Sequence, residues 1–326
     1  MSGSTSGSPT HYGPVGESSS DILLEKTFLA SGYLTGVGFG IQFVLYLQCL
    51  GVLWQRRPQS CNLTLSSRVL IPYLTILCAM NLIWTATSAY GLQLTFIDNR
   101  NYPGGPVAFL GVEFALPDNV VSLASYIAAN IMADALMIWR CYVVWDASQG
   151  SKAKYVVLII PCMMLLTNLA LAILFALETT GPPGLFASIT ASFAVPYFAL
   201  SMSMNVILTF LIVGRIWFCE TRRRGSMGWY TFTKAIFVES AAMYSIIGFL
   251  LMVTFSIGHP INQIWLGIAP SVQLIANYLI VYRVANGSAW NDRQSAPGHT
   301  THGYPGDLEK TDDDLSLGSD AKGERN

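Results

Sequence analysis

The sequence predicts an all-α membrane protein, a bundle of seven transmembrane helices with a disordered tail at each end. Of its 326 residues, 52% are hydrophobic and only 11% are charged, whereas about a quarter of the residues of a soluble domain are charged. The apolar residues fall into seven runs of roughly 20 or more, the length at which a helix crosses a bilayer. These runs do not alternate as barrel strands do, so helices must satisfy the backbone within the membrane.

The predicted transmembrane domain covers residues 28–287. The N-terminal tail, residues 1–27, is rich in Gly and Ser, and the C-terminal tail, residues 288–326, is polar and acidic. We expect both tails to be disordered, and we expect no cleaved signal because no basic segment precedes the first apolar run. The seven helices are predicted at residues 28–54, 68–95, 119–145, 155–177, 187–213, 234–257 and 264–284.

Lys and Arg residues are distributed unevenly between the two sides of this bundle. Of the 18, all but Lys26 and Arg100 fall in the first, third and fifth connections with their helix edges, or in the C-terminal tail. The positive-inside rule therefore places the N-terminus outside and the C-terminus in the cytosol. Because no retention signal is visible, the plasma membrane is the default location. Glycan on the sequon at Asn62, in the first connection, would contradict this topology.

The longest predicted outer connection, residues 96–118, begins with a segment rich in Pro and Gly, which marks turns. Its second half, from Phe109 to Phe114, is mostly apolar. We expect this half to pack as a lid over the outer helix ends.

The third predicted helix carries an ionisable side chain deep in an apolar run. Asn130, Asp134, Met137 and Cys141 recur at i, i+4, i+7 and i+11, so they share one face of the helix. Placing a charged Asp in the hydrocarbon costs about 3 kcal/mol on insertion scales, so this face should point into the bundle. Asp134 is either a functional residue (a ligand counter-ion, an ion site or a state switch) or a structural polar lock.

Arg140, on the same helix, is expected to have a separate partner. It lies six positions from Asp134, about 120° around the helix, so the two cannot pair as i, i+4 neighbours do. Glu239 occupies the same cytosolic half of the bundle and is the predicted partner, forming a switch or packing pair. Alternatively, Arg140 extends to the lipid headgroups.

The seventh predicted helix offers two amides, Gln273 and Asn277, spaced i, i+4. Together with Asn130 and Asp134 they form the candidate ligand or ion site, and Asn81 and Asn205 could contribute from other helices. The alternative for these amides is interhelical hydrogen bonding that only holds the helices together.

A basic patch, Arg222, Arg223 and Arg224, lies in the fifth connection. Such a cluster suits anionic lipids of the inner leaflet, and the same patch could serve a cytosolic protein partner of unknown identity. The net charge of −1 gives no basic field for nucleic acid.

No catalytic constellation is visible, so we expect no enzyme. Asp134 is the only aspartate in a predicted span, and the four histidines lie in tails or an outer connection. A two-aspartate mechanism, a metal site and a bound cofactor are therefore not expected.

Two groups of motifs carry a family resemblance. Asp134 is followed by Trp139-Arg-Cys-Tyr-Val-Val-Trp145, and the seventh helix contains Ile268-Ala-Pro-Ser271 and ends in Tyr282-Arg-Val-Ala-Asn-Gly-Ser-Ala-Trp290. These motifs resemble an uncharacterised group of seven-helix integral membrane proteins of mushroom-forming (basidiomycete) fungi. The resemblance covers about residues 28–290 and implies the seven-helix architecture, but no activity, because none is established for the group.

A weaker likeness is to G-protein-coupled receptors, through the helix count, the orientation and Arg140-Cys-Tyr in the third helix. The sequence departs from that pattern because Trp139, rather than an acid, precedes Arg140. It also has no proline after Asn277.

Three functions are compatible with these residues. The first is a receptor-like sensor, in which an outer ligand shifts the sixth and seventh helices and alters an Arg140–Glu239 contact. The second is a transporter or channel that uses Asp134 as a proton or cation site. The third is a structural membrane protein without a ligand, whose buried polar groups only fix the packing.

Overall fold

The computed structural model describes residues 18–55, 64–146, 153–181, 188–222 and 227–295. Within these ranges the chain is helical and contains no strand. A short helix, α3 (Gly105–Glu113), and a π-helical turn, η1 (Leu94–Asp98), accompany seven long helices. The long helices are α1 (Ser19–Gln55), α2 (Thr64–Gln93), α4 (Pro117–Asp146), α5 (Ala153–Thr180), α6 (Ser188–Arg222), α7 (Met227–Ser256) and α8 (Asn262–Ser295).

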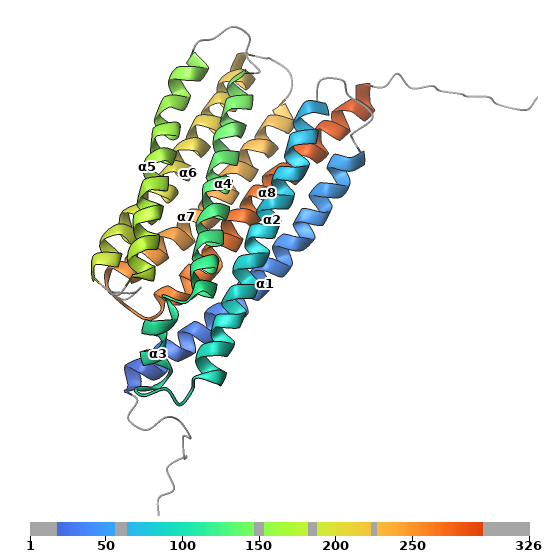
Figure 1. The fold of residues 1–326 in the computed structure, drawn as a ribbon. Helices are drawn as coiled ribbons and strands as arrows, with labels where there is room; N and C mark the ends of the chain where they lie inside the picture. Colours follow the sequence, from blue (N-terminus) through green and yellow to red (C-terminus); the bar gives the residue numbers. More distant parts are fainter. Residues whose placement is uncertain (1–17, 56–63, 147–152, 182–187, 223–226, 296–326) are drawn as a thin grey trace, which may run out of the picture.

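The long helices lie side by side in one bundle, and α3 lies at one end of it, which we call the α3 end (Figure 1). Helix α4 packs against α2, α5, α6 and α8, while α8 also packs against α1 and α7. In their most apolar segments, 56% of the residues of α4 and 61% of those of α8 are buried, against 17% in α1. Helices α4 and α8 therefore form the interior of the bundle.

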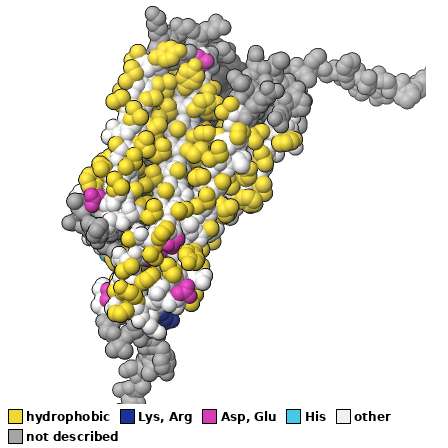
Figure 2. Space-filling view, in the orientation of Figure 1, with side chains coloured by type: hydrophobic (Ala, Val, Ile, Leu, Met, Phe, Trp, Pro, Cys, Tyr) yellow, Lys and Arg dark blue, Asp and Glu magenta, His cyan; other side chains and the backbone are white. Residues whose placement is uncertain are grey.

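Six of the long helices are long and apolar enough to cross a membrane, and α7 contributes a shorter apolar segment, Ala241–Ser256. Large apolar side chains such as Val37 on α1 and Ile160 on α5 face outward. Figure 2 shows hydrophobic side chains along most of the length of the bundle, with few charged ones, mainly toward its ends. A soluble protein rarely exposes so much contiguous apolar surface, so these helices indicate a multi-pass membrane protein.

The ends of the transmembrane domain differ from the prediction. Helix α1 begins at Ser19 rather than at residue 28, and α8 continues to Ser295, so the predicted tails were wrong for residues 19–27 and 288–295. At the start of α1, the Ser18 backbone N–H donates to the Asp21 carboxylate at 3.0 Å, and the Asp21 N–H donates to Ser18 Oγ at 3.3 Å. This reciprocal pattern is a capping box, which marks the true start of the helix. The predicted boundary was based on hydropathy, which marks only the part of a helix that crosses the lipid. Residues 1–17 and 296–326 of the predicted tails lie outside the described residues.

The connection predicted to form a lid contains η1 and α3. Gly104, just before α3, has a φ of +94°, a left-handed conformation that favours glycine. Phe109 and Leu110 on α3 are buried. The apolar half of this connection packs against the bundle as predicted, and it does so as a helix.

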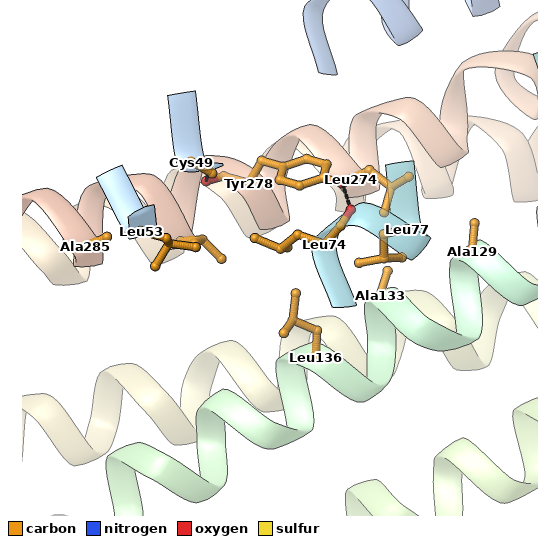
Figure 3. Packing of buried hydrophobic residues seen from close by; sticks show 11 residues of the cluster. Cys49, Leu53, Leu74, Leu77, Ala129, Ala133, Leu136, Leu274, Tyr278 and Ala285 are labelled. Carbon is orange, nitrogen blue, oxygen red and sulfur yellow. Dashed lines mark hydrogen bonds between the residues drawn. The ribbon is translucent and has the colours of Figure 1, made fainter. Parts of the chain in front are cut away.

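A cluster of buried apolar side chains joins α1, α2, α4 and α8 (Figure 3). Leu74 and Leu77 of α2 meet Ala133 of α4 and Leu274 of α8, all with at most 2% of their surface exposed. Tyr278 Oη of α8 donates a hydrogen bond to the Leu74 carbonyl at 2.9 Å. A tyrosine hydroxyl without a partner would be costly in such a core, so this bond fixes α8 against α2.

Helices α1 and α8 approach closely at Gly38. A methyl group added to Gly38 would lie 2.7 Å from Ser271 Cβ, whereas one added to Gly40 would meet no atom within 4 Å. We predict that Gly38→Ala destabilises the protein by about 1–3 kcal/mol, because the two backbones must separate. Gly40→Ala, the matched control on the same helix, should leave stability unchanged or slightly raised. Thermal unfolding in detergent measures both, and equal melting temperatures would contradict the close approach.

Candidate functional site

The predicted inward face of the third transmembrane helix lies on α4. Asn130, Asp134, Met137 and Cys141 are all buried, with 6%, 3%, 6% and 0% of their surfaces exposed. The helical spacing of these residues therefore predicted their orientation correctly.

Asp134 is the centre of a hydrogen-bond network within the bundle. Gln273 Nε2 of α8 donates to Asp134 Oδ1 at 2.7 Å. Ser201 Oγ of α6 donates to Asp134 Oδ2 at 3.1 Å, and Asn168 Nδ2 of α5 approaches the same oxygen at 3.5 Å. Both carboxyl oxygens thus accept hydrogen bonds from other helices. No ion pair to Asp134 occurs among the described residues, so polar donors, rather than a basic side chain, stabilise its carboxyl group.

The network reaches α7 through Ser201, whose hydroxyl lies 3.0 Å from Tyr244 Oη. Helices α5, α6, α7 and α8 are therefore all joined to the carboxyl of α4, directly or through one hydroxyl. We call Asp134, Asn168, Ser201, Tyr244 and Gln273 the Asp134 network.

Sequence reasoning missed three members of this network: Asn168, Ser201 and Tyr244. Asn168 was detectable as an isolated amide in the apolar run of the fourth predicted span. Serine and tyrosine are common in membrane helices, so the residue types of Ser201 and Tyr244 carry no comparable signal.

Three of the four residues of the predicted ligand site, Asp134, Gln273 and Asn277, border one small void, and Asn130 is not among its lining residues. Gln273 joins Asp134, as expected. Asn130 Nδ2 instead donates to Tyr197 Oη at 3.3 Å, and Asn277 binds Arg140. Of the other amides, Asn81 Nδ2 donates to Gln42 Oε1 between α2 and α1, and Asn205 lies near Asp134.

Both predictions for Arg140 were wrong. Arg140 is buried, with 7% of its surface exposed, so it does not extend to the headgroups. Its Nη1 donates to Asn277 Oδ1 at 3.1 Å, and its Nη2 donates to the Asn277 carbonyl oxygen at 2.7 Å. Glu239 is exposed and faces Arg283 at 3.9 Å. Both residues contact α8, Glu239 at Arg283 and Arg140 at Asn277, so α8 supplies the partner of Arg140.

The space next to Asp134 is small. A void of about 10 Å³ is bordered by Asp134, Asn205, Gln273 and Asn277 together with apolar residues of α4, α7 and α8. This volume suffices for about one water molecule. This void is therefore too small for an organic ligand at Asp134.

A larger cavity lies at the α3 end and has a volume of about 110 Å³. We call it the outer cavity, after the outer side on which the Lys and Arg distribution predicts this end to lie. It lies among α1, α2, α4 and α8, with α3 beside it, and shares no lining residue with the void at Asp134. Sequence reasoning missed this cavity because its two acidic residues, Glu113 and Asp118, lie in a predicted connection rather than in a predicted span.

Glu113 is buried at the end of α3, outside the candidate spans, with 8% of its surface exposed. Thr95 Oγ1 donates to its Oε2 at 2.6 Å. Burial raises the pKa of Glu113 to about 7, against the lowering effect of the Thr95 hydrogen bond, and the nearby Asp118 adds a smaller increase. The carboxyl group of Glu113 therefore changes its charge near neutral pH.

The predicted basic patch lies mostly outside the described residues. Arg223 and Arg224 lie outside the described residues, and Arg222 ends α6 with its side chain also outside them. Within the described ranges, no group of three or more His, Cys, Asp or Glu side chains could hold a metal ion.

Comparisons with protein-family models, curated proteins and solved structures gave no significant match. The resemblance to fungal seven-helix proteins and to receptors stays a prediction.

The corrected partner of Arg140 can be tested by mutation. Asn277→Ala removes an acceptor from a buried guanidinium, so we predict a loss of about 1–3 kcal/mol of stability. Glu239→Gln alters only an exposed ion pair and should leave stability nearly unchanged. The measurement is thermal unfolding of each variant in detergent. A larger loss of stability in Glu239→Gln than in Asn277→Ala would support the pairing of Arg140 with Glu239 instead.

The raised pKa of Glu113 predicts how stability depends on pH. Because the folded protein binds this proton more tightly than the unfolded chain, stability should fall as pH rises from about 4.5 to about 7, by at most about 3 kcal/mol. Glu113→Gln should remove this part of the pH dependence. Asp98→Asn, at an exposed acid near the same end, should retain it. Melting temperatures at pH 5 and pH 8 give the comparison, and parallel profiles for wild type and Glu113→Gln would refute the prediction.

Proposed function

We propose that the chain is a seven-helix, receptor-like sensor of the plasma membrane, with its N-terminus outside and a ligand site at the α3 end. Counting α7 with the six candidate spans gives seven crossings, so the two termini lie on opposite sides. The distribution of Lys and Arg then makes the α3 end the outer end. In this topology the fifth connection, which carries Arg222, Arg223 and Arg224, is cytosolic, and its charges bind anionic lipid of the inner leaflet.

The observation that carries this proposal is the Asp134 network. One buried carboxyl group accepts hydrogen bonds from α5, α6 and α8, and Ser201 extends the network to α7. A shift of α7 or α8 would break particular bonds of a buried polar group rather than deform them gradually, because such groups are costly to leave unpaired. The network therefore favours discrete packing states, as a sensor requires.

The second element of the proposed switch is the contact of Arg140 with Asn277. The guanidinium binds both the side chain and the backbone carbonyl of one α8 residue. A displacement of α8 that strains the Asp134–Gln273 bond would also strain this contact. In the proposed sensor, α8 thus takes the role that the sequence suggested for Glu239.

A transporter that binds a proton or cation at Asp134 is the second candidate. It is favoured by the void beside Asp134, which is bordered by three amide side chains and has room for about one water molecule. It would require an open path to Asp134 in another state. The tight packing of α4 and α8 around this residue favours the sensor.

Hydrogen–deuterium exchange of the full chain in nanodiscs tests the switch. We predict that Asp134→Asn raises exchange at least several-fold in α7 and α8, because an amide cannot accept the same set of hydrogen bonds. Thr209→Val is the matched control, since Thr209 is buried on α6 outside the network and its hydroxyl has no partner among the described residues. It should leave exchange in α7 and α8 unchanged.

Two outcomes would contradict the sensor. A lower melting temperature in Asp134→Asn with unchanged exchange in α7 and α8 would indicate a structural lock. Proton uptake driven by a pH gradient in proteoliposomes, present in wild type and lost in Asp134→Asn, would indicate a transporter.

A further inference from the structure

The outer cavity has the dimensions of a site for a small molecule. Its volume of about 110 Å³ could hold roughly seven to eleven water molecules, since each needs about 10–15 Å³ by this measure. It is therefore about ten times as large as the void at Asp134, and it can accept an organic molecule where that void cannot.

The charged groups that line the outer cavity are all acidic. Glu113 from the end of α3 and Asp118 from the first turn of α4 both border it, and no Lys, Arg or His is present among its described lining residues. The Glu113 carboxylate is held in place by Thr95. It also packs against the backbone of Gly91, where an added methyl group would lie 2.5 Å from Glu113 Oε1. A fixed carboxylate without a basic partner in a concave site favours a cation.

The walls of the outer cavity are suited to the body of an organic ligand. Phe28, Trp84 and Phe114 line it, and Trp84 is itself packed against Tyr126 with ring centroids 5.0 Å apart. Aromatic rings attract cations through their faces and bury apolar groups efficiently. A bare metal ion would leave these walls without contacts, so an organic cation fits better.

Two buried hydrogen-bond donors at this site lack acceptors. Gln263 of α8 lines the cavity with 3% of its surface exposed, and its Nε2 has no partner among the described residues. Trp84 Nε1 is also buried and has no hydrogen-bond partner among the described residues. Leaving a buried donor unpaired is unfavourable, so a ligand that brings an acceptor would complete the site.

We propose that the outer cavity binds a small protonated amine that carries an apolar body and one hydrogen-bond acceptor. The Glu113 carboxylate faces the ammonium group, the aromatic walls surround the body, and Gln263 donates to the acceptor. The proposal deepens the sensor function and rests on it for its biological role. Binding itself can be measured independently of any response.

Three probes of similar shape separate these contributions. Phenylethanolamine has the amine, the ring and a hydroxyl acceptor; phenethylamine lacks the hydroxyl, and phenethyl alcohol lacks the amine. We expect saturable binding of phenylethanolamine to the full chain in nanodiscs at pH 8, measured by isothermal titration calorimetry. Phenethylamine should bind severalfold more weakly, and phenethyl alcohol at least about tenfold more weakly. Protein-free nanodiscs give the blank for partition into lipid.

Variants then assign each contribution to a residue. Glu113→Gln should weaken phenylethanolamine binding at least about tenfold, while Asp98→Asn, the matched control, should not change it. Gln263→Leu should remove the advantage of phenylethanolamine over phenethylamine. No saturable binding, equal binding of amine and alcohol, or unchanged binding in Glu113→Gln would overturn the proposal.

The pH dependence of wild-type binding keeps the proposal testable if Glu113→Gln does not fold. Both amines stay protonated below pH 8, whereas Glu113, whose pKa is about 7, becomes neutral. Asp118 is the other titratable group of the cavity lining. Affinity should therefore fall as pH decreases from 8 to 6, and a constant affinity would overturn the role of Glu113.

The sensor and the ligand site can fail separately. Amine binding without any change of exchange in α7 and α8 would leave the ligand site standing and reject the sensor. Conversely, increased exchange in Asp134→Asn without amine binding would leave the switch standing and reject this ligand class.

Discussion

The hydrogen bond from Gln273 to Asp134 is the contact on which the interior of the bundle depends. A carboxyl group among apolar helices has no bulk water to solvate it, so neighbouring helices must supply its hydrogen bonds. Gln273, Ser201 and Asn168 do so from three different helices. Each donor restricts the rotation of its own helix, because turning it by one residue would carry the donor away. The packing of α4, α6 and α8 is thereby specified more narrowly than apolar contacts alone would require.

The acid and the base of α4 are satisfied separately by the same neighbour. Gln273 and Asn277 are one turn apart on α8, and they meet Asp134 and Arg140 in the same order along the chain. Asp134 and Arg140 are about 9 Å apart along their helix axis, and the two α8 residues about 6 Å. The long side chain of Arg140 makes up the difference, and a sliding or rotation of α8 changes both contacts together. If Asp134 and Arg140 had paired directly, α8 would have had no hydrogen bond to either of them.

The sequence was sufficient to predict the features that follow from helical phase and length. It placed Asp134 and Cys141 on one buried face of α4, and it identified Gln273 as an amide available to the bundle. It did not identify Ser201 or Tyr244, because the rotation of α6 and α7 depends on packing between helices. Depth along the membrane made Glu239 a plausible partner for Arg140. The pairing also depends on which side of its helix each residue lies. Glu239 lies on the exposed side of its helix, away from the buried Arg140.

The outer cavity and the Asp134 network lie on the same structural element. Gln263 lines the cavity, and Gln273 lies ten residues further along α8, about 15 Å away along the helix axis. In the proposed sensor, a ligand that binds Gln263 acts on the end of a continuous helix whose middle is bonded to Asp134 and Arg140. A ligand can shift this equilibrium only if it binds the two positions of α8 unequally. The Nε2 of Gln263, which has no partner among the described residues, provides such a difference. A hydrogen bond from it to a bound acceptor forms only where α8 brings this side chain within reach.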